Sequence, residues 1–280
     1  MSQRGFTLIE MAMVIVLIGL IVSGGLFALA PILDKAKTNQ TNATLDQVES
    51  ALELFAIRYS RLPCPADGSL ANIAANSGTY GLEQGGGATG CSVPVTNAVI
   101  PWKTLGLDES YSLDGWNNRL SYWTSGMPNL GTGAVTSTAY LTRTGSSYPA
   151  FAGITVTDVV SGQAVTPDPT KAGTPNQYDQ AAYVLVSHGK SGWYSWPKNN
   201  TAFPVLSAFQ ALFPGGAKQC NSSPTTCTIK GVAVPNSFVT GGPVGLSPPR
   251  DNTYFDDIVR WRSASFIIQL CGSGGPCGNP

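Results

Sequence analysis

The carboxylate of Glu10 is the group in this sequence whose position most clearly calls for a chemical role. It is followed by twenty-three residues, Met11 to Leu33, that carry no charge. An ionisable group inside an apolar segment costs about a few kcal/mol in lipid, so we expect it to have a specific partner. Only five residues precede Phe6, too few for an ordinary cleaved signal peptide. We therefore predict a functional role for Glu10.

Ser187 and His188 are the residues that most resemble a nucleophile next to its base. Neighbouring residues of a strand point to opposite faces, however, so these two side chains are poorly placed to hydrogen-bond to each other. The sequence also has neither a G-x-S-x-G nor an H-E-x-x-H motif. We interpret His188 as a structural or surface histidine and expect that the protein is not an enzyme.

Asp256 and Asp257, with Asp251 nearby, form the one carboxylate cluster that could hold a hard cation such as calcium. The alternative, which we favour, is a solvated or helix-capping turn before Ile258. A zinc site would need C-x-x-C spacing or a histidine partner, and His188 is the sole histidine. We expect no cofactor, and calcium stays open as an alternative.

The six cysteines are even in number, which suits disulfides in an oxidising compartment. Six cysteines allow fifteen connectivities, and the two shortest loops favour local pairing. The pairs expected on this basis are Cys220 with Cys227, Cys271 with Cys277, and Cys64 with Cys91.

The composition favours an extracytoplasmic, loop-rich β protein. Charged residues make up 11% of the chain, roughly half the usual share, while glycine (32) and proline (20) are abundant. Sixteen basic residues balance sixteen acidic ones, so no electrostatic footprint indicates nucleic-acid binding.

The apolar segment that follows Glu10 predicts a transmembrane or assembly helix over residues 6–33. As a helix these twenty-eight residues would be about 42 Å long, enough to cross the hydrocarbon core of a bilayer. Three glycines and one proline predict a local kink or melted stretch in its second half: Gly19, Gly24, Gly25 and Pro31.

A second, amphipathic helix is predicted over residues 34–60 as a continuation of the first. One apolar stripe recurs in steps of three and four, and we expect it to pack against the following domain. Its members are Leu45, Val48, Leu52, Phe55 and Tyr59, with Asp46, Glu49, Glu53 and Arg58 on other faces. Pro63 and Pro65 forbid continuation of the helix.

Residues 61–280 are predicted to form an extracytoplasmic globular domain rich in strands, with inserted loops. Alternation and β-branching predict strands over 136–143, 154–160, 182–187, 228–234 and 265–270. A short helix is expected over 205–213 and a surface loop over 161–177. The layout predicts an α+β fold, in which a long N-terminal helix packs on a C-terminal antiparallel sheet.

The opening run Gly5-Phe6-Thr7-Leu8-Ile9-Glu10 resembles the type IV prepilin signature. The resemblance implies that residues 1–5 are a cytoplasmic leader, that prepilin peptidase cuts after Gly5, and that the new N-terminal Phe6 is methylated. Glu10 would then pair with the amine of Phe6, on a neighbouring subunit of a filament. The competing interpretation is that Glu10 merely reaches the cytoplasmic surface.

Three later segments are similar to stretches of the major pseudopilin of type II secretion: 114–122, 186–192 and 257–261. In that family the last two supply calcium-binding carboxylates. Here Ser191 stands at the first such position and Asp257 keeps the second. The chain is also longer than a typical major subunit, with an apparent insertion from about 125 to 180.

These observations predict a structural subunit, a minor pilin or pseudopilin, of a type IV pilus or a type II secretion pseudopilus. The precursor would lie in the bacterial inner membrane with its C-terminal domain outside the cytoplasm. Its expected partners are prepilin peptidase, other pilin or pseudopilin subunits and the inner-membrane assembly platform. The alternative is a pilin-stalked adhesin, or a tip subunit that binds substrate or DNA, with Trp193, Tyr194 and Trp196 as candidate contacts.

Overall fold

The computed structural model describes the chain in segments. These are residues 7–70, 72–73, 76–86, 90–93, 97–125, 154–158, 165, 180–190, 192, 195–198, 228–229, 232–233, 237–240 and 256–271. The backbone alone is described for residues 21–30, 157–158, 228–229, 232–233, 237–240 and 271.

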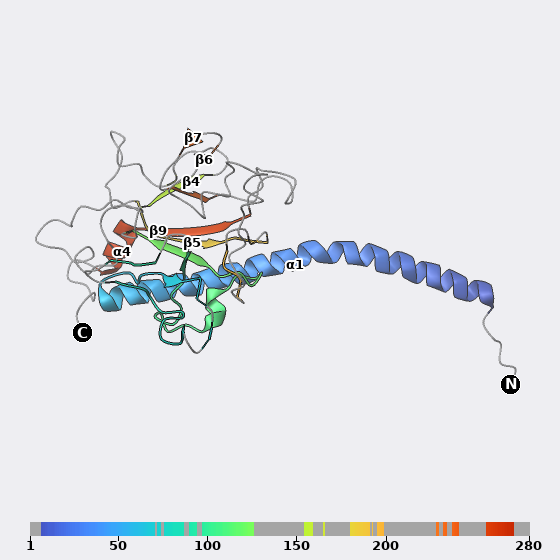
Figure 1. The fold of residues 1–280 in the computed structure, drawn as a ribbon. Helices are drawn as coiled ribbons and strands as arrows, with labels where there is room; N and C mark the ends of the chain where they lie inside the picture. The colour runs from blue at the N-terminus through green and yellow to red at the C-terminus, as the bar shows by residue number, and fades with distance from the viewer. Residues whose placement is uncertain are drawn as a thin grey trace, which may run out of the picture.

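A single helix, α1 (Leu8–Tyr59), joins the two helical segments that the sequence predicts. It begins at Thr7, which is extended and caps the helix, and it ends at Ser60, whose φ of 52° is left-handed. Pro31 lies inside α1, and the helix continues through it as a gently curved rod whose N-terminal half projects from the globular domain (Figure 1). The helix is therefore continuous over the stretch where the sequence predicts a kink or a melted segment.

The main sheet has five strands in the order β1-β2-β3-β5-β9, and every neighbouring pair is antiparallel. Its strands are β1 (Ala66–Asp67), β2 (Ala98–Val99), β3 (Ser121–Thr124), β5 (Ala181–Ser187) and β9 (Ile258–Ser263). A parallel pair, β4 (Thr155–Asp158) with β8 (Ser237–Thr240), and a small antiparallel pair, β6 (Thr228–Ile229) with β7 (Val232–Ala233), form two further sheets. Two short helices complete the described elements: η4 (Glu109–Ser112) and α4 (Ala264–Cys271).

Apolar clusters cover both faces of the main sheet. On one face, Leu45, Val48 and Leu52 of α1 are completely buried in a cluster with residues of β3, β5 and α4. The predicted apolar stripe is thus a core-packing surface, except that Tyr59 at its end is 45% exposed. On the other face, Trp123 and Val184 cluster with Val156 of β4 and the two cysteines at positions 64 and 91. The α+β class with an N-terminal helix and an antiparallel sheet is confirmed.

Strand β5 agrees with the prediction for 182–187, and β4 covers part of 154–160. Residues 228–234 contain the short pair β6 and β7 rather than one strand. The predicted strand over 136–143, the helix over 205–213 and the loop over 161–177, apart from residue 165, lie outside the described residues.

The strand predicted over 265–270 is wrong, because these residues form α4. Ile267 and Ile268 are β-branched, but together with Ala264 they face the core at helical spacing, next to α1. The hydroxyl of Ser263 accepts a bond of 3.2 Å from the backbone N–H of Phe266 and caps the helix start. The turn at 256–257 is expected from the sequence to be solvated or to cap a helix, and the helix-capping form is wrong, since Ile258 begins strand β9.

Candidate functional site

The start of α1 holds the Glu10 carboxylate in a defined position. Oε2 of Glu10 accepts bonds from the backbone N–H of Thr7 (2.8 Å) and from its hydroxyl (2.9 Å). In return, Oγ1 of Thr7 accepts a bond of 3.4 Å from the backbone N–H of Glu10, which completes a capping box. The carboxylate is therefore folded back toward the helix N-terminus, and Oε1 is left to accept a bond from another donor. Gly5 and Phe6 lie outside the described residues.

The projecting half of α1 carries apolar side chains on all of its faces. The large ones described between Leu8 and Leu20 are 47% to 90% exposed. A helix that is apolar all round needs apolar surroundings, either lipid or other helices. Within the described part of the chain, no helix combines the length and the apolar character required to cross a membrane.

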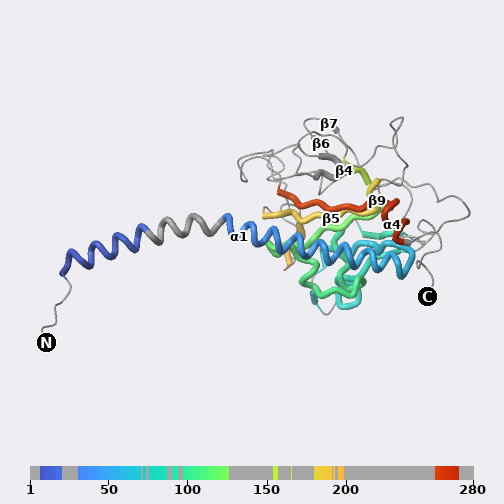
Figure 2. The backbone as a smooth tube through the Cα atoms, turned by 180° about the vertical axis from the view of Figure 1, so that it is seen from behind, coloured from blue at the N-terminus to red at the C-terminus, as the bar shows by residue number. Residues whose placement is uncertain are grey.

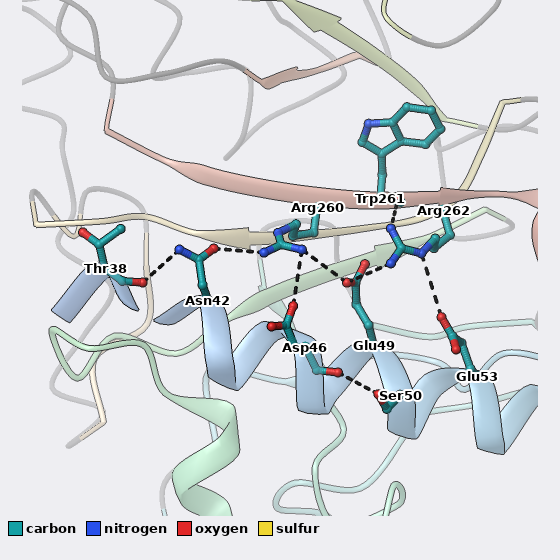
Figure 3. A network of polar contacts seen from close by, with 9 residues as sticks. All are labelled: Thr38, Asn42, Asp46, Glu49, Ser50, Glu53, Arg260, Trp261 and Arg262. Atoms are coloured by element: carbon teal, nitrogen blue, oxygen red, sulfur yellow. Dashed lines mark hydrogen bonds and ion pairs between the residues drawn. The ribbon is translucent and has the colours of Figure 1, made fainter. Parts of the chain in front are cut away.

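The C-terminal half of α1 is joined to β9 by a group of polar and charged side chains that we call the clasp: Asn42, Asp46, Glu49, Glu53, Arg260 and Arg262 (Figure 3). Arg262 bonds to Glu49 (Nη2–Oε2, 3.1 Å) and lies 3.8 Å from Glu53. Arg260 bonds to Asn42 (3.0 Å) and lies 3.4 Å from Asp46 and 3.6 Å from Glu49.

Glu49 is the buried centre of the clasp. Its side chain is 4% exposed, and its Oε1 has no hydrogen-bond partner among the residues that the structure describes. Burial raises the pKa of Glu49, although the nearby Arg262 and Arg260 oppose that effect. The sequence predicts Glu49 on a different face of the helix from the apolar stripe, and gives no sign of its burial. The alternating Arg-x-Arg of β9 was the signal that could have indicated a basic partner for this helix face.

A second polar cluster forms where three separate segments meet, at the end of β5 and the start of β9. The hydroxyl of Ser187, at the end of β5, donates a bond of 2.8 Å to Oδ2 of Asp114, and the side-chain amide of Asn118 donates one of 3.2 Å to the carbonyl of Gly189. Asp257, just before β9, places Oδ2 at 3.9 Å from Nδ1 of His188. The structure thus brings together parts of the three segments 114–122, 186–192 and 257–261.

His188 contacts a different serine from the one beside it in the sequence. Its Nε2 lies 2.9 Å from the hydroxyl of Ser121 on β3, whereas Ser187 bonds to Asp114. The ring is 1% exposed and Ser121 is 4% exposed, so neither offers a substrate a direct approach. Burial lowers the pKa of His188 to about 4, which keeps the ring neutral at ordinary pH. This geometry supports a structural role.

The same cluster lies against α1 where the helix enters the domain. Lys190 pairs with Asp34 (2.7 Å), and the backbone N–H of Gly115 donates a bond of 3.0 Å to the hydroxyl of Thr41. A Cβ atom at Gly115 would lie 2.4 Å from the carbonyl oxygen of Lys37, so this close approach requires glycine.

The two carboxylates of the alternative calcium site are Asp256 and Asp257. Asp257 faces His188. The backbone of Asp256 lies close to Gly189, because a Cβ atom added at Gly189 would be 2.4 Å from the carbonyl oxygen of Asp256. Within the part of the chain that the structure describes, no three His, Cys, Asp or Glu side chains are grouped as a metal site would need. Calcium binding through Asp256 and Asp257 remains the alternative to a protein without a cofactor.

A disulfide joins Cys64, just after α1, to Cys91, with the two Cα atoms 5.4 Å apart. This is the pairing expected for these two cysteines. Glu83 reinforces the same corner, because it accepts bonds from Arg61 (2.7 Å) and from the backbone N–H of Cys64 (3.0 Å). Cys220, Cys227 and Cys277 lie outside the described residues, as does the side chain of Cys271, so the other two pairings stay predictions.

Of the three aromatic residues suggested as ligand contacts, Trp193 and Tyr194 lie outside the described residues. Trp196 packs against the backbone of Gly68, and its carbonyl accepts a bond of 2.8 Å from the backbone N–H of Arg119. This position supports a packing role for Trp196.

Comparison with known families matches residues 1–26 to the prokaryotic N-terminal methylation motif. This motif is the type IV pilin and pseudopilin signature, and it points to a structural, pilin-type precursor rather than an enzyme. The signature implies processing by prepilin peptidase and assembly with other pilins. No curated protein and no solved structure matches the chain.

Proposed function

We propose that this protein is a minor pilin or pseudopilin that assembles through α1 into a type IV pilus or a type II secretion pseudopilus. The observation that carries the proposal is the capping box at the start of α1. It holds a carboxylate at the head of an exposed apolar helix, within the segment that matches the methylation motif.

Cleavage after Gly5 would create a positively charged amine on Phe6, next to the residue that caps α1. Glu10 already points toward this end of the helix, and its Oε1 is available to accept a bond from the amine of a neighbouring subunit. A carboxylate without a partner in an apolar bundle is costly, so this ion pair favours one axial register of the helices over others. The precursor would wait in the inner membrane with its leader in the cytoplasm.

The clasp and the disulfide suit such a subunit because they fix the globular domain to its helix. Arg260 and Arg262 reach the C-terminal half of α1 from the last strand of the sheet, and the Cys64–Cys91 bond closes the corner where the helix ends. A pulling force along α1 would then be transmitted to the sheet through these links.

The proposal can be tested with Glu10→Gln, which removes the charge but keeps a side chain that can complete a capping box. We expect the variant to be cleaved normally and to fail to enter filaments, measured by the mobility of the mature form and by its amount in sheared filament fractions. Asp34→Asn is the matched control, because it neutralises a partly exposed carboxylate of the same helix that lies outside the clasp. Normal incorporation of Glu10→Gln would contradict the proposed role.

A further inference from the structure

Strand β9 forms one edge of the main sheet, and β8 lies close to it without pairing with it. Among the residues that the structure describes, β9 pairs with β5 alone. It is six residues long and contains neither proline nor glycine. Long free edges are normally blocked by such residues, by charges or by bulges, because their backbone groups can bind another strand.

An open groove of about 430 Å³ follows this edge. Among the described residues, it is lined by five consecutive ones, 259–263, together with Phe266 of α4. Consecutive strand residues point to opposite faces, so a groove that touches all five must run along the backbone edge rather than over one face. The carbonyl of Trp261 accepts a long bond of 3.4 Å from the side chain of Arg262, which an incoming N–H could replace.

The two charged residues of β9 do not block the strand edge, because both form ion pairs within the clasp. Arg260 and Arg262 turn toward α1, where two guanidinium groups face the three carboxylates of Asp46, Glu49 and Glu53. These ion pairs offset the positive charge of the two arginines that line the groove, which disfavours an anionic ligand such as nucleic acid. Free backbone groups beside apolar Trp261 and Phe266 suit an extended polypeptide.

The position of β9 relative to α1 indicates where such a polypeptide would come from. Figures 1 and 2, seen from opposite sides, both show β9 running alongside the C-terminal half of α1. Subunits whose projecting helices pack side by side would also have neighbouring globular domains, so a segment of one domain could reach a strand edge of the next.

We propose that the free edge of β9 binds an extended segment from the globular domain of a neighbouring pilin-type subunit, which adds a strand to the sheet. This inference rests on the proposed function, since it requires subunits with parallel helices.

A photo-crosslinking experiment on the full-length protein in assembling cells tests this inference. A benzophenone amino acid replaces Trp261 in the groove, or Tyr111 on η4, an aromatic residue that is 37% exposed outside it. We expect irradiation to join position 261 to another filament subunit, with no such product from position 111. The product should be lost when Glu10→Gln is added, and filament incorporation of each labelled protein is measured in parallel.

A third label at Ile15, on the projecting half of α1, separates the failure of this inference from that of the proposed function. Products from Ile15 without any from position 261 would overturn the edge contact alone. An absence of subunit products from both positions would overturn the filament role as well. Products from position 261 with nucleic acid, or with a protein that is not a filament subunit, would also contradict the edge contact.

Discussion

Replacing Arg262 by methionine would remove the closest ion-pair partner of Glu49 and leave its carboxylate buried. Glu49 is 4% exposed, its Oε1 already lacks a hydrogen bond, and Arg260, at 3.6 Å, would be its remaining cation. Breaking a buried pair costs about 3–5 kcal/mol, whereas an exposed pair contributes about 0–1 kcal/mol. Since Arg262 is 36% exposed and Arg260 remains, we expect a loss of about 2 kcal/mol.

The free energy of unfolding of the full-length protein, measured in detergent by chemical denaturation, would test this value. In a domain of this size the loss corresponds to a fall in Tm of about 4–8 °C. The double variant Glu49→Met with Arg262→Met should recover part of the loss, because it removes the buried charge together with its partner. Glu53→Gln is the control for losing a clasp carboxylate that is itself partly exposed.

The pH dependence gives a second readout of the same mechanism. Burial raises the pKa of Glu49 above its ordinary value of 4.5, and removal of a neighbouring cation would raise it further. The stability of the Arg262→Met variant should therefore approach that of the wild type as the pH falls through the raised pKa toward 4.5. A loss below about 0.5 kcal/mol, or a deficit that does not shrink in acid, would refute the idea that a buried charge causes it.

Three further changes have effects that the structure predicts. Burial lowers the pKa of His188 to about 4, so the wild type should lose up to about 3 kcal/mol of stability as the pH falls from 6.5 to 4. His188→Phe should flatten that slope in denaturation curves, and an unchanged slope would assign it to other groups. Replacing Cys64 and Cys91 together by serine should lower the free energy of unfolding by about 3–4 kcal/mol, because their bond closes a loop of 27 residues. A non-reducing gel verifies the bond in the parent protein, and an unchanged stability would contradict its role. Gly115→Ala should cost about 1–3 kcal/mol through its clash with the carbonyl of Lys37, and an unaltered Tm would show that the contact relaxes freely.

The features that the sequence could predict are those whose physical cause is local. Glu10 is conspicuous because no charge follows it for twenty-three residues, and Thr7 stands three positions before it, at capping-box spacing. The buried stripe of α1 likewise follows from the spacing of Leu45, Val48 and Leu52 alone. Helical periodicity is carried by neighbouring residues and needs no knowledge of the rest of the chain.

The features that it could not predict depend on residues far apart in the chain. Glu49 lies beside the apolar stripe and looks solvated until Arg262, 213 residues later, is placed next to it. Likewise, the six residues 265–270 suit a strand by composition, and only their packing against α1 selects a helix. The contact between His188 and Ser121 could not be predicted either, because Ser121 is 67 residues away on another strand.

The proposed Glu10 pairing and the proposed β9 contact place linked demands on how subunits stack. Glu10 and Glu49 are 39 positions apart on one helix, which is about 58 Å. If a neighbouring helix slipped by one turn, its domain would move by about 5.4 Å along the filament. A strand rises about 3.3 Å per residue, so that slip would shift the pairing at the β9 edge by between one and two residues and disturb its alternation of faces. A subunit in the register that forms the Glu10 ion pair would therefore also have to match the strand pairing at the β9 edge. A subunit that forms only one of these two contacts would bind its neighbours more weakly.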